Sequence, residues 1–99
     1  MSRSVISNQS IFEYAVSHST PPDGVLQELI NKTRDSTGRA AGMQIGADQG
    51  AFMTILSGSL RPRFAVEVGT FTGYSSICIA RGLAPEGKLL CCDVSEEWT

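Results

Sequence analysis

Residues 64–76 read FAVEVGTFTGYSS, and the fold expected for the whole chain follows from them. The first five residues form an apolar run interrupted only by Glu67, which is typical of a short strand with a core on both faces. Gly69 and Gly73 mark a turn, and apolar residues recur at helical spacing after Gly73. A strand, turn and helix of this kind bring bare backbone N–H groups and the positive end of a helix dipole to the carboxyl edge of a sheet. Open α/β sheets bind nucleotides at that edge.

Spacing separates three ways in which such a turn could bind a nucleotide. A P-loop needs Lys followed by Ser or Thr after its second glycine, but the dipeptide Tyr-Ser follows Gly73. The dinucleotide fingerprint needs a glycine where this chain has Phe71, whose side chain would obstruct a pyrophosphate. What remains is the pattern Glu67-x-Gly69-x-x-x-Gly73, in which the carboxylate can accept hydrogen bonds from a cationic amine or a hydroxyl. Because no basic side chain is offered, the turn suits a ligand with an amino acid and a nucleoside but no phosphate.

The segment 66–75, VEVGTFTGYS, resembles motif I of S-adenosylmethionine (SAM)-dependent O-methyltransferases of the catechol and caffeoyl-CoA O-methyltransferase type. The form Gly-x-x-x-Gly-Tyr-Ser is more specific than a bare glycine loop. Residues 43–50, MQIGADQG, resemble the segment ahead of the third helix in that family, and residues 88–93, KLLCCD, resemble its second strand with a terminal acid. The resemblance covers roughly residues 25–99.

This resemblance implies an α/β fold, the Rossmann-like fold of class I methyltransferases, seen here as N-terminal helices plus the first two parallel strands. Residues 1–99 would be the N-terminal part of a single methyltransferase domain, helical over 1–62, with the cofactor-binding core starting over 63–99. The implied activity is methyl transfer to a phenolic or catechol-type hydroxyl, assisted by a divalent metal, usually magnesium. The family's metal ligands, two Asp and one Asn or Asp, belong to later strands beyond Thr99. We therefore assign no metal ligand and no catalytic base.

The resemblance also implies which residues surround SAM. Glu67 would hold the amino group of its methionine part or an adjoining backbone donor, and Ser75 would form a hydrogen bond near the carboxylate. Ile45 would offer backbone groups to the same end, although Met43 and Ile45 could instead plug the edge of the core. The predicted cofactor-binding residues are Met43, Ile45, Glu67, Gly69, Thr70, Phe71, Tyr74, Ser75 and Asp93.

Asp93 is the second acidic candidate. It directly follows the apolar run 88–92, 24 residues after Gly69. In nucleotide-binding α/β folds, an acid at about this interval accepts hydrogen bonds from the ribose hydroxyls. The alternative is that Asp93 caps a helix starting near Glu96. Glu67 and the two glycines upstream favour the ribose role.

Composition narrows the function classes further. The chain has 99 residues, of which 41% are hydrophobic and 18% charged, as in an ordinary globular domain. A formal net charge of -2 and scattered basic residues argue against nucleic acid and against an anionic membrane surface. No apolar run approaches the length of a membrane span, and the first twenty residues lack the features of a signal peptide. We expect a cytoplasmic protein.

Three cysteines and one histidine add no metal or disulfide signal. Cys78, Cys91 and Cys92 lack Cys-x-x-Cys spacing, and we expect all three to be reduced core residues. His18 lacks a second ligand or nucleophile near it in the sequence, so we expect it at a surface or interface.

The N-terminal part predicts helices. Ser7 or Asn8 could cap a first helix, and prolines within 20–24, TPPDG, end it. A second helix is expected from Pro22 or Asp23 to Arg34. Its inner stripe is expected to be Val25, Leu26, Leu29, Ile30 and Thr33. In the resembling family this region helps to form the substrate mouth and a dimer contact, which implies a homodimer.

The middle of the chain predicts a loop over 35–42 and a third helix capped by Asp48. The buried stripe of this helix is expected to be Phe52, Ile55, Leu56 and Ser59 or Leu60. A helix over 74–83 and a strand over 88–92 follow, and a crossover of this length requires a parallel strand pair with a right-handed connection.

Two parallel strands do not complete a sheet that is covered on both faces. We therefore expect the chain to be the front part of a longer protein or to depend on another chain. The alternative to an enzyme is a non-catalytic, truncated methyltransferase-like module that binds SAM or a partner chain. A third hypothesis, a nicotinamide-binding domain, is disfavoured by Phe71, and a comparison of NAD with S-adenosylhomocysteine (SAH) binding would test it.

Overall fold

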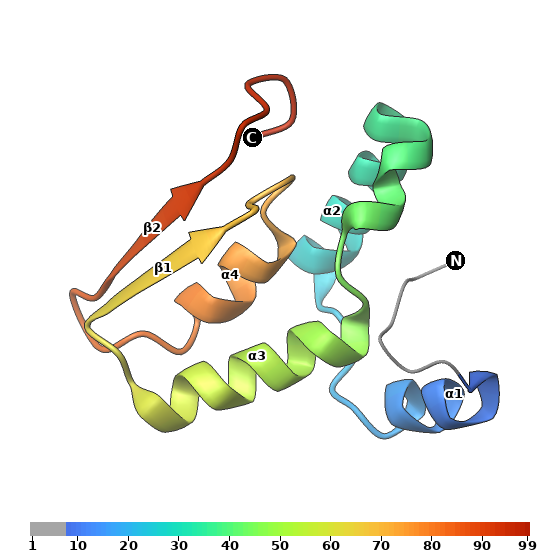
Figure 1. Cartoon of the computed structure of the whole chain (residues 1–99). Coiled ribbons are helices and arrows are strands. Elements are labelled where there is room, and N and C mark those ends of the chain that lie inside the picture. The colour runs from blue at the N-terminus through green and yellow to red at the C-terminus, as the bar shows by residue number, and fades with distance from the viewer. Residues whose placement is uncertain (1–7) are drawn as a thin grey trace.

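The computed structural model describes residues 8–99, in which helices precede a strand–helix–strand unit (Figure 1). The elements are α1 Gln9–Ser17, α2 Gly24–Thr37, the 3-10 helix η1 Gly38–Met43, α3 Ala47–Leu60, β1 Phe64–Val68, α4 Tyr74–Ala80 and β2 Lys88–Cys92. Within this part of the chain, no helix is long and apolar enough to cross a membrane.

The two strands are parallel neighbours, and α4 connects them. Phe64 pairs with Lys88 and Val68 pairs with Cys92, so the carboxyl ends of both strands lie at one edge. Both strands and their parallel pairing confirm the prediction. One face of the strand pair is covered by α4, and α3 lies on the far side of α4 (Figure 1). The glycine turn and the residues after β2 therefore meet at the same edge.

The core lies where α2, α3 and α4 meet. Its buried apolar residues are Leu26, Tyr74 and Cys78, and those packed on them are Leu29, Ile30, Ile45, Met53 and Ile77. Removal from water raises the pKa of the Tyr74 hydroxyl, as expected for a phenol inside a core. Most of the inner stripe predicted for the second helix is confirmed, whereas Val25 is exposed.

Small residues let α3 and α4 approach closely. The Ser57 hydroxyl donates a 2.7 Å hydrogen bond to a backbone carbonyl in α4. A Cβ on Gly50 would lie 2.6 Å from the Tyr74 ring, and a Cβ on Gly82 would lie 2.3 Å from the backbone nitrogen of Gly58. These distances are shorter than van der Waals contact, so the helix contact requires glycine at both positions.

The side-chain cap predicted at Asn8 is confirmed, whereas Asp23, predicted as a possible first residue of the second helix, is the cap of α2, which begins at Gly24. Asn8 accepts a hydrogen bond from the Ile11 backbone N–H at 3.2 Å, and Asp23 accepts one from the Leu26 N–H at 3.0 Å. The other candidate cap of the first helix, Ser7, lies outside the described residues. Each cap satisfies one of the backbone donors that a helix start leaves unpaired.

Helix boundaries differ from the prediction in the middle of the chain. The loop expected over 35–42 is wrong, because α2 continues to Thr37 and η1 follows directly. Gly38, with φ of 57°, ends α2 in a conformation that glycine adopts easily. Asp48 is not the cap of α3, since Gly46 occupies that position and Asp48 lies in the first turn. The helix expected over 74–83 ends earlier, at Ala80.

The stripe predicted to be buried on α3 is wrong. The large apolar residues of the predicted stripe are exposed, whereas Gly50 and Ser57 are the buried residues of this helix and Met53 is partly buried against the core. The reason is the close helix contact, which only small residues allow. Two of the three predicted core cysteines are also wrong: Cys78 is buried, whereas Cys91 and Cys92 are exposed on β2.

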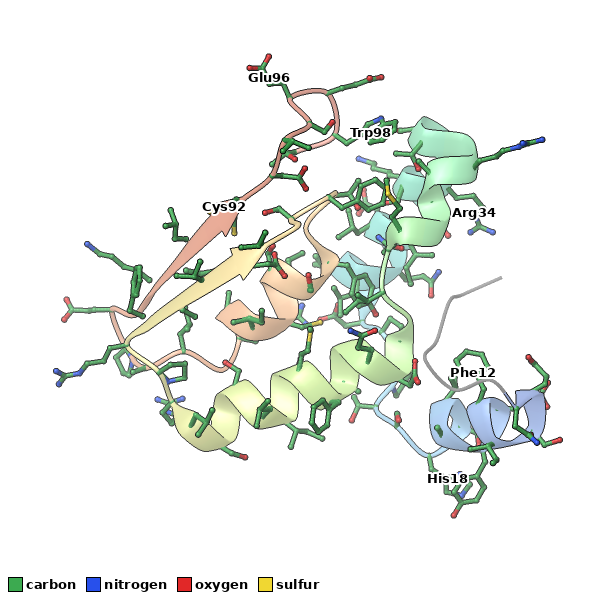
Figure 2. All side chains as sticks on the ribbon, viewed as in Figure 1. Phe12, His18, Arg34, Cys92, Glu96 and Trp98 are labelled. Atoms are coloured by element: carbon green, nitrogen blue, oxygen red, sulfur yellow. The ribbon has the colours of Figure 1, made fainter. Side chains whose placement is uncertain are left out.

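The expectation for His18 is confirmed, since it is exposed at the end of α1. Its ring stacks on Tyr14, with ring centroids 3.9 Å apart (Figure 2). This contact lies far from the sheet edge at which the glycine turn lies (Figure 1). No role in the site below is therefore assigned to it.

Candidate functional site

The turn between β1 and α4 has an unusual backbone. Gly69, Phe71 and Gly73 all have positive φ, at 93°, 51° and 99°. Glycine adopts this region without penalty, but an aromatic residue does so at a cost. No atom lies within 4 Å of an ideal Cβ on either glycine, so the backbone is open to approach from outside. A ligand could therefore contact the main chain at these two positions.

The turn is bonded to the residues that end β2. The Gly69 N–H donates to the Cys92 carbonyl at 2.8 Å, and the Phe71 N–H donates to Asp93 Oδ2 at 2.7 Å. The Thr70 hydroxyl also points to the Cys92 carbonyl, at 3.4 Å. The structure therefore brings the predicted residues of the turn together with the predicted acid at the end of β2.

Asp93 is exposed and accepts backbone hydrogen bonds on both oxygens. Besides the Phe71 bond, Oδ1 accepts from the N–H groups of Val94 and Ser95, at 2.6 and 3.0 Å. The N–H of Phe71, and then that of Ser95, hold the pKa of this carboxyl below its usual value. Asp93 is therefore a charged acceptor at the sheet edge, and it caps a turn in this structure.

The Glu67 carboxylate lies on the α4 side of β1 and is only 8% exposed. Its two oxygens accept hydrogen bonds from the hydroxyls of Ser75 and Ser76, which lie in the first turn of α4. A buried carboxylate requires such partners, because an unpaired buried charge is costly. Ser76 was missed by sequence reasoning, although its place next to Ser75 in the motif was a usable signal.

Phe71 also contacts the end of the described chain. Its ring meets the Trp98 ring edge to face, with centroids 5.8 Å apart. Trp98 folds back from the residues after β2 toward the end of α2 (Figure 2).

Tyr74, another predicted cofactor-binding residue, does not point to the turn. Its side chain is buried against α3.

The end of η1 and the residues that follow it reach the same turn. Met43 is 60% exposed, whereas Ile45 packs on the edge of the core. Between them, Gln44 donates through Nε2 to the hydroxyls of Thr33 and Thr72, at 3.1 and 3.3 Å. None of these three polar residues was in the predicted site. Two features of the sequence could have indicated them: Thr33 lies on the otherwise apolar stripe of α2, and Thr72 lies inside motif I.

A hollow of about 450 Å³ lies beside the turn, between α2 and the first turn of α4. Its lining residues are Thr70, Thr72 and Gly73 from the turn, Lys32 from α2 and Cys91 from β2.

The described part of the chain offers no metal site. Among residues 8–99, no three His, Cys, Asp or Glu side chains lie close enough together to bind a metal ion.

Comparison with known proteins identifies the family. A family model described as O-methyltransferase matches residues 16–99. A probable caffeoyl-CoA O-methyltransferase 2 from Dictyostelium discoideum is 36% identical over 92 residues, which are 93% of this chain and 39% of that protein. Caffeoyl-CoA O-methyltransferase 2 from Petunia hybrida is 29% identical, over 96% of this chain and 39% of its own. The chain therefore spans about two fifths of the length of these relatives.

Solved structures agree on the fold. An O-methyltransferase from Bacillus cereus in complex with SAH superposes with a TM-score of 0.77 at 29% identity, over 88% of this chain and 39% of that one. The O-methyltransferase TomG from Streptomyces achromogenes, in complex with SAM, gives a TM-score of 0.76 at 29% identity, over 90% and 39%. The helices and two parallel strands match the N-terminal part of class I methyltransferase structures. The chain belongs to the SAM-dependent O-methyltransferase family of the caffeoyl-CoA O-methyltransferase type, as motif I predicted.

Proposed function

We propose that the protein transfers the methyl group of SAM to a phenolic or catechol-type hydroxyl. One observation carries the proposal: in a chain of this family, the open backbone of the glycine turn and the charged Asp93 meet at one sheet edge, joined by the Phe71 N–H bond. SAM, when bound, supplies an electrophilic methyl group on a sulfonium. The residues described here would bind and orient it, which is the main catalytic requirement of an in-line displacement.

The proposed roles of the carboxylates follow from their surroundings. An ionised carboxylate has about four positions for accepting hydrogen bonds, and Asp93 already uses three. To accept both ribose hydroxyls it would release at least one of these bonds, and the bond to Phe71 N–H is the one that faces the turn. Glu67 uses two of its positions for Ser75 and Ser76, which leaves about two for the amino group of SAM or an adjoining backbone donor.

Four further parts of the proposal rest on the resemblance to the family and on the composition of the chain: the catechol-type acceptor, the divalent metal, the homodimer and a cytoplasmic location. The metal would lower the pKa of the acceptor hydroxyl. Since residues 8–99 gather no metal-ligand group, we derive no step through the metal from this chain.

The test is methyl transfer from SAM labelled on its methyl group to catechol and caffeoyl-type phenols, with the full-length protein and Mg²⁺. We expect turnover with at least one of these acceptors. Binding of SAM without turnover on any of them would reject the acceptor class, whereas failure to bind SAM would reject the function itself.

A substitution tests the proposed cofactor site. Asp93→Asn keeps the shape but removes the charge, and hydrogen bonds to charged groups are worth about 1.5–3 kcal/mol. We expect SAM to bind at least about tenfold more weakly, as measured by calorimetry. Glu13→Gln is the matched control. Glu13 is exposed on α1, and its carboxylate accepts a hydrogen bond from the Gln9 side chain one helical turn earlier. Unchanged affinity in Asp93→Asn would remove Asp93 from the site.

A further inference from the structure

We propose that Thr33, on α2, is a positioning residue for the cofactor site. It would hold the glycine turn and the segment that contains Met43 and Ile45 at a fixed separation. This inference rests on the proposed function, since it concerns the two chain segments that would contact SAM. Thr33 itself would touch no cofactor atom and would act through Thr72 and Gln44.

The contacts form a closed triangle. The hydroxyl oxygens of Thr33 and Thr72 lie 2.8 Å apart, and the Gln44 side-chain nitrogen donates to both. Thr33 is only 1% exposed, and Thr72 and Gln44 are half-buried. Three segments that are distant in the sequence are thereby joined through one buried hydroxyl. In a low-dielectric environment such hydrogen bonds are stronger than in water.

The triangle holds the turn on the side opposite to Asp93. On the sheet side, the N–H groups of Gly69 and Phe71 are bonded to the end of β2. On the helix side, the Thr72 hydroxyl is bonded to Thr33 and Gln44. If Asp93 releases Phe71 to accept a ribose, the sheet-side anchor weakens and the helix-side anchor remains. Because Phe71 has positive φ, the turn needs an anchor to keep this conformation.

Packing alone does not call for a hydroxyl at this position. The neighbouring inner positions of α2 are Leu26, Leu29 and Ile30, which are apolar. Valine has nearly the same shape as threonine and avoids the cost of burying a polar group. The hydroxyl is therefore explained by its bonds to the turn and to Gln44, which an apolar residue would not make.

The experiment compares SAM and SAH affinities of the full-length parent, Thr33→Val and Thr33→Ser, together with their thermal unfolding without ligand. We expect Thr33→Val to bind about tenfold more weakly, since it removes two of the three hydrogen bonds of the triangle and leaves only the 3.3 Å bond between Gln44 and Thr72. We expect Thr33→Ser to restore affinity to within about twofold. Thr54→Val is the matched control. The Thr54 hydroxyl bonds the Gly50 carbonyl within α3, and its loss should lower stability without changing affinity.

The outcomes separate positioning from stability. Thr33→Val with parental affinity would overturn the inference, as would equal losses of affinity in Thr33→Val and Thr54→Val. Should Thr33→Val not fold, Gln44→Met removes the two donors from the triangle at a more exposed site and is judged by the same criteria. A parent that binds neither SAM nor SAH would overturn the proposed function, and the inference with it. A parent that binds both, with an unaffected Thr33→Val, would overturn the inference alone.

Discussion

Glu67 and Asp93 bring two carboxylates to the carboxyl edge of the strand pair, and each has different hydrogen-bond partners. Spacing in the sequence indicated this placement, since Glu67 is the penultimate residue of β1 and Asp93 directly follows β2. Their present partners depend on tertiary geometry: Glu67 bonds two hydroxyls of α4, and Asp93 bonds the Phe71 N–H. Thr33 was predicted as part of an apolar stripe. Periodicity indicates which face of a helix is buried, but it does not indicate the hydrogen-bond partners of a hydroxyl on that face.

The bonds of Asp93 predict a dependence on pH. Its pKa is lowered from 3.8, first by the Phe71 N–H and then by the Ser95 N–H. A depressed folded-state pKa means that these bonds stabilise the folded chain above pH 3.8 and are lost as pH falls through the lowered value. We expect the amide proton of Phe71, followed by NMR without ligand, to shift with a midpoint below 3.8. A midpoint at or above that value would show that Asp93 does not hold the turn in solution.

At the scale of elements, the strands were predicted correctly and the helix packing was not. Contiguous apolar runs bounded by glycine and proline mark strands directly in the sequence. The apolar period of α3 predicts a helix but not the element it packs against, so the prediction of a buried stripe of large apolar residues is wrong. The true contact face is made of small residues, because α4 lies so close that Gly50 and Ser57 touch it.

This close helix contact makes Gly82 sensitive to substitution. In Gly82→Ala the added Cβ would lie 2.3 Å from the Gly58 nitrogen and 2.5 Å from Ser57, so the turn that follows α4 must move away from α3. We expect the free energy of unfolding to fall by roughly 1–3 kcal/mol, the usual cost of overpacking, in denaturant titrations. Gly24→Ala is the control. Nothing lies within 4 Å of a Cβ added at Gly24, which is the first residue of α2. Equal stabilities of the two variants would contradict the packing described here.

The whole molecule exposes an apolar sheet face opposite α4. Phe64, Val66 and Val68 alternate along β1 on this face, and Leu90 lies beside Val66 on β2. Parallel sheets are covered on both faces in known proteins, because both faces carry apolar side chains. We therefore expect further polypeptide, from this protein or from another chain, to cover this face.

Two substitutions of equal exposure test this expectation. Val66 is 54% exposed and Ile11, on α1, is 57% exposed, so exposure alone predicts similar effects of an introduced charge. If the sheet face is covered, Val66→Asp buries an unpaired carboxylate, which should lower the free energy of unfolding by at least about 3 kcal/mol, a large part of a domain's stability, and lower the midpoint of thermal unfolding accordingly. Ile11→Asp should change stability by about 0.5 kcal/mol or less, as for a surface site. The measurement is the midpoint of thermal unfolding of the parent and of both variants, each prepared at the length of the protein in its native source. Matching midpoints for the two variants would mean that water contacts the sheet face in the intact protein.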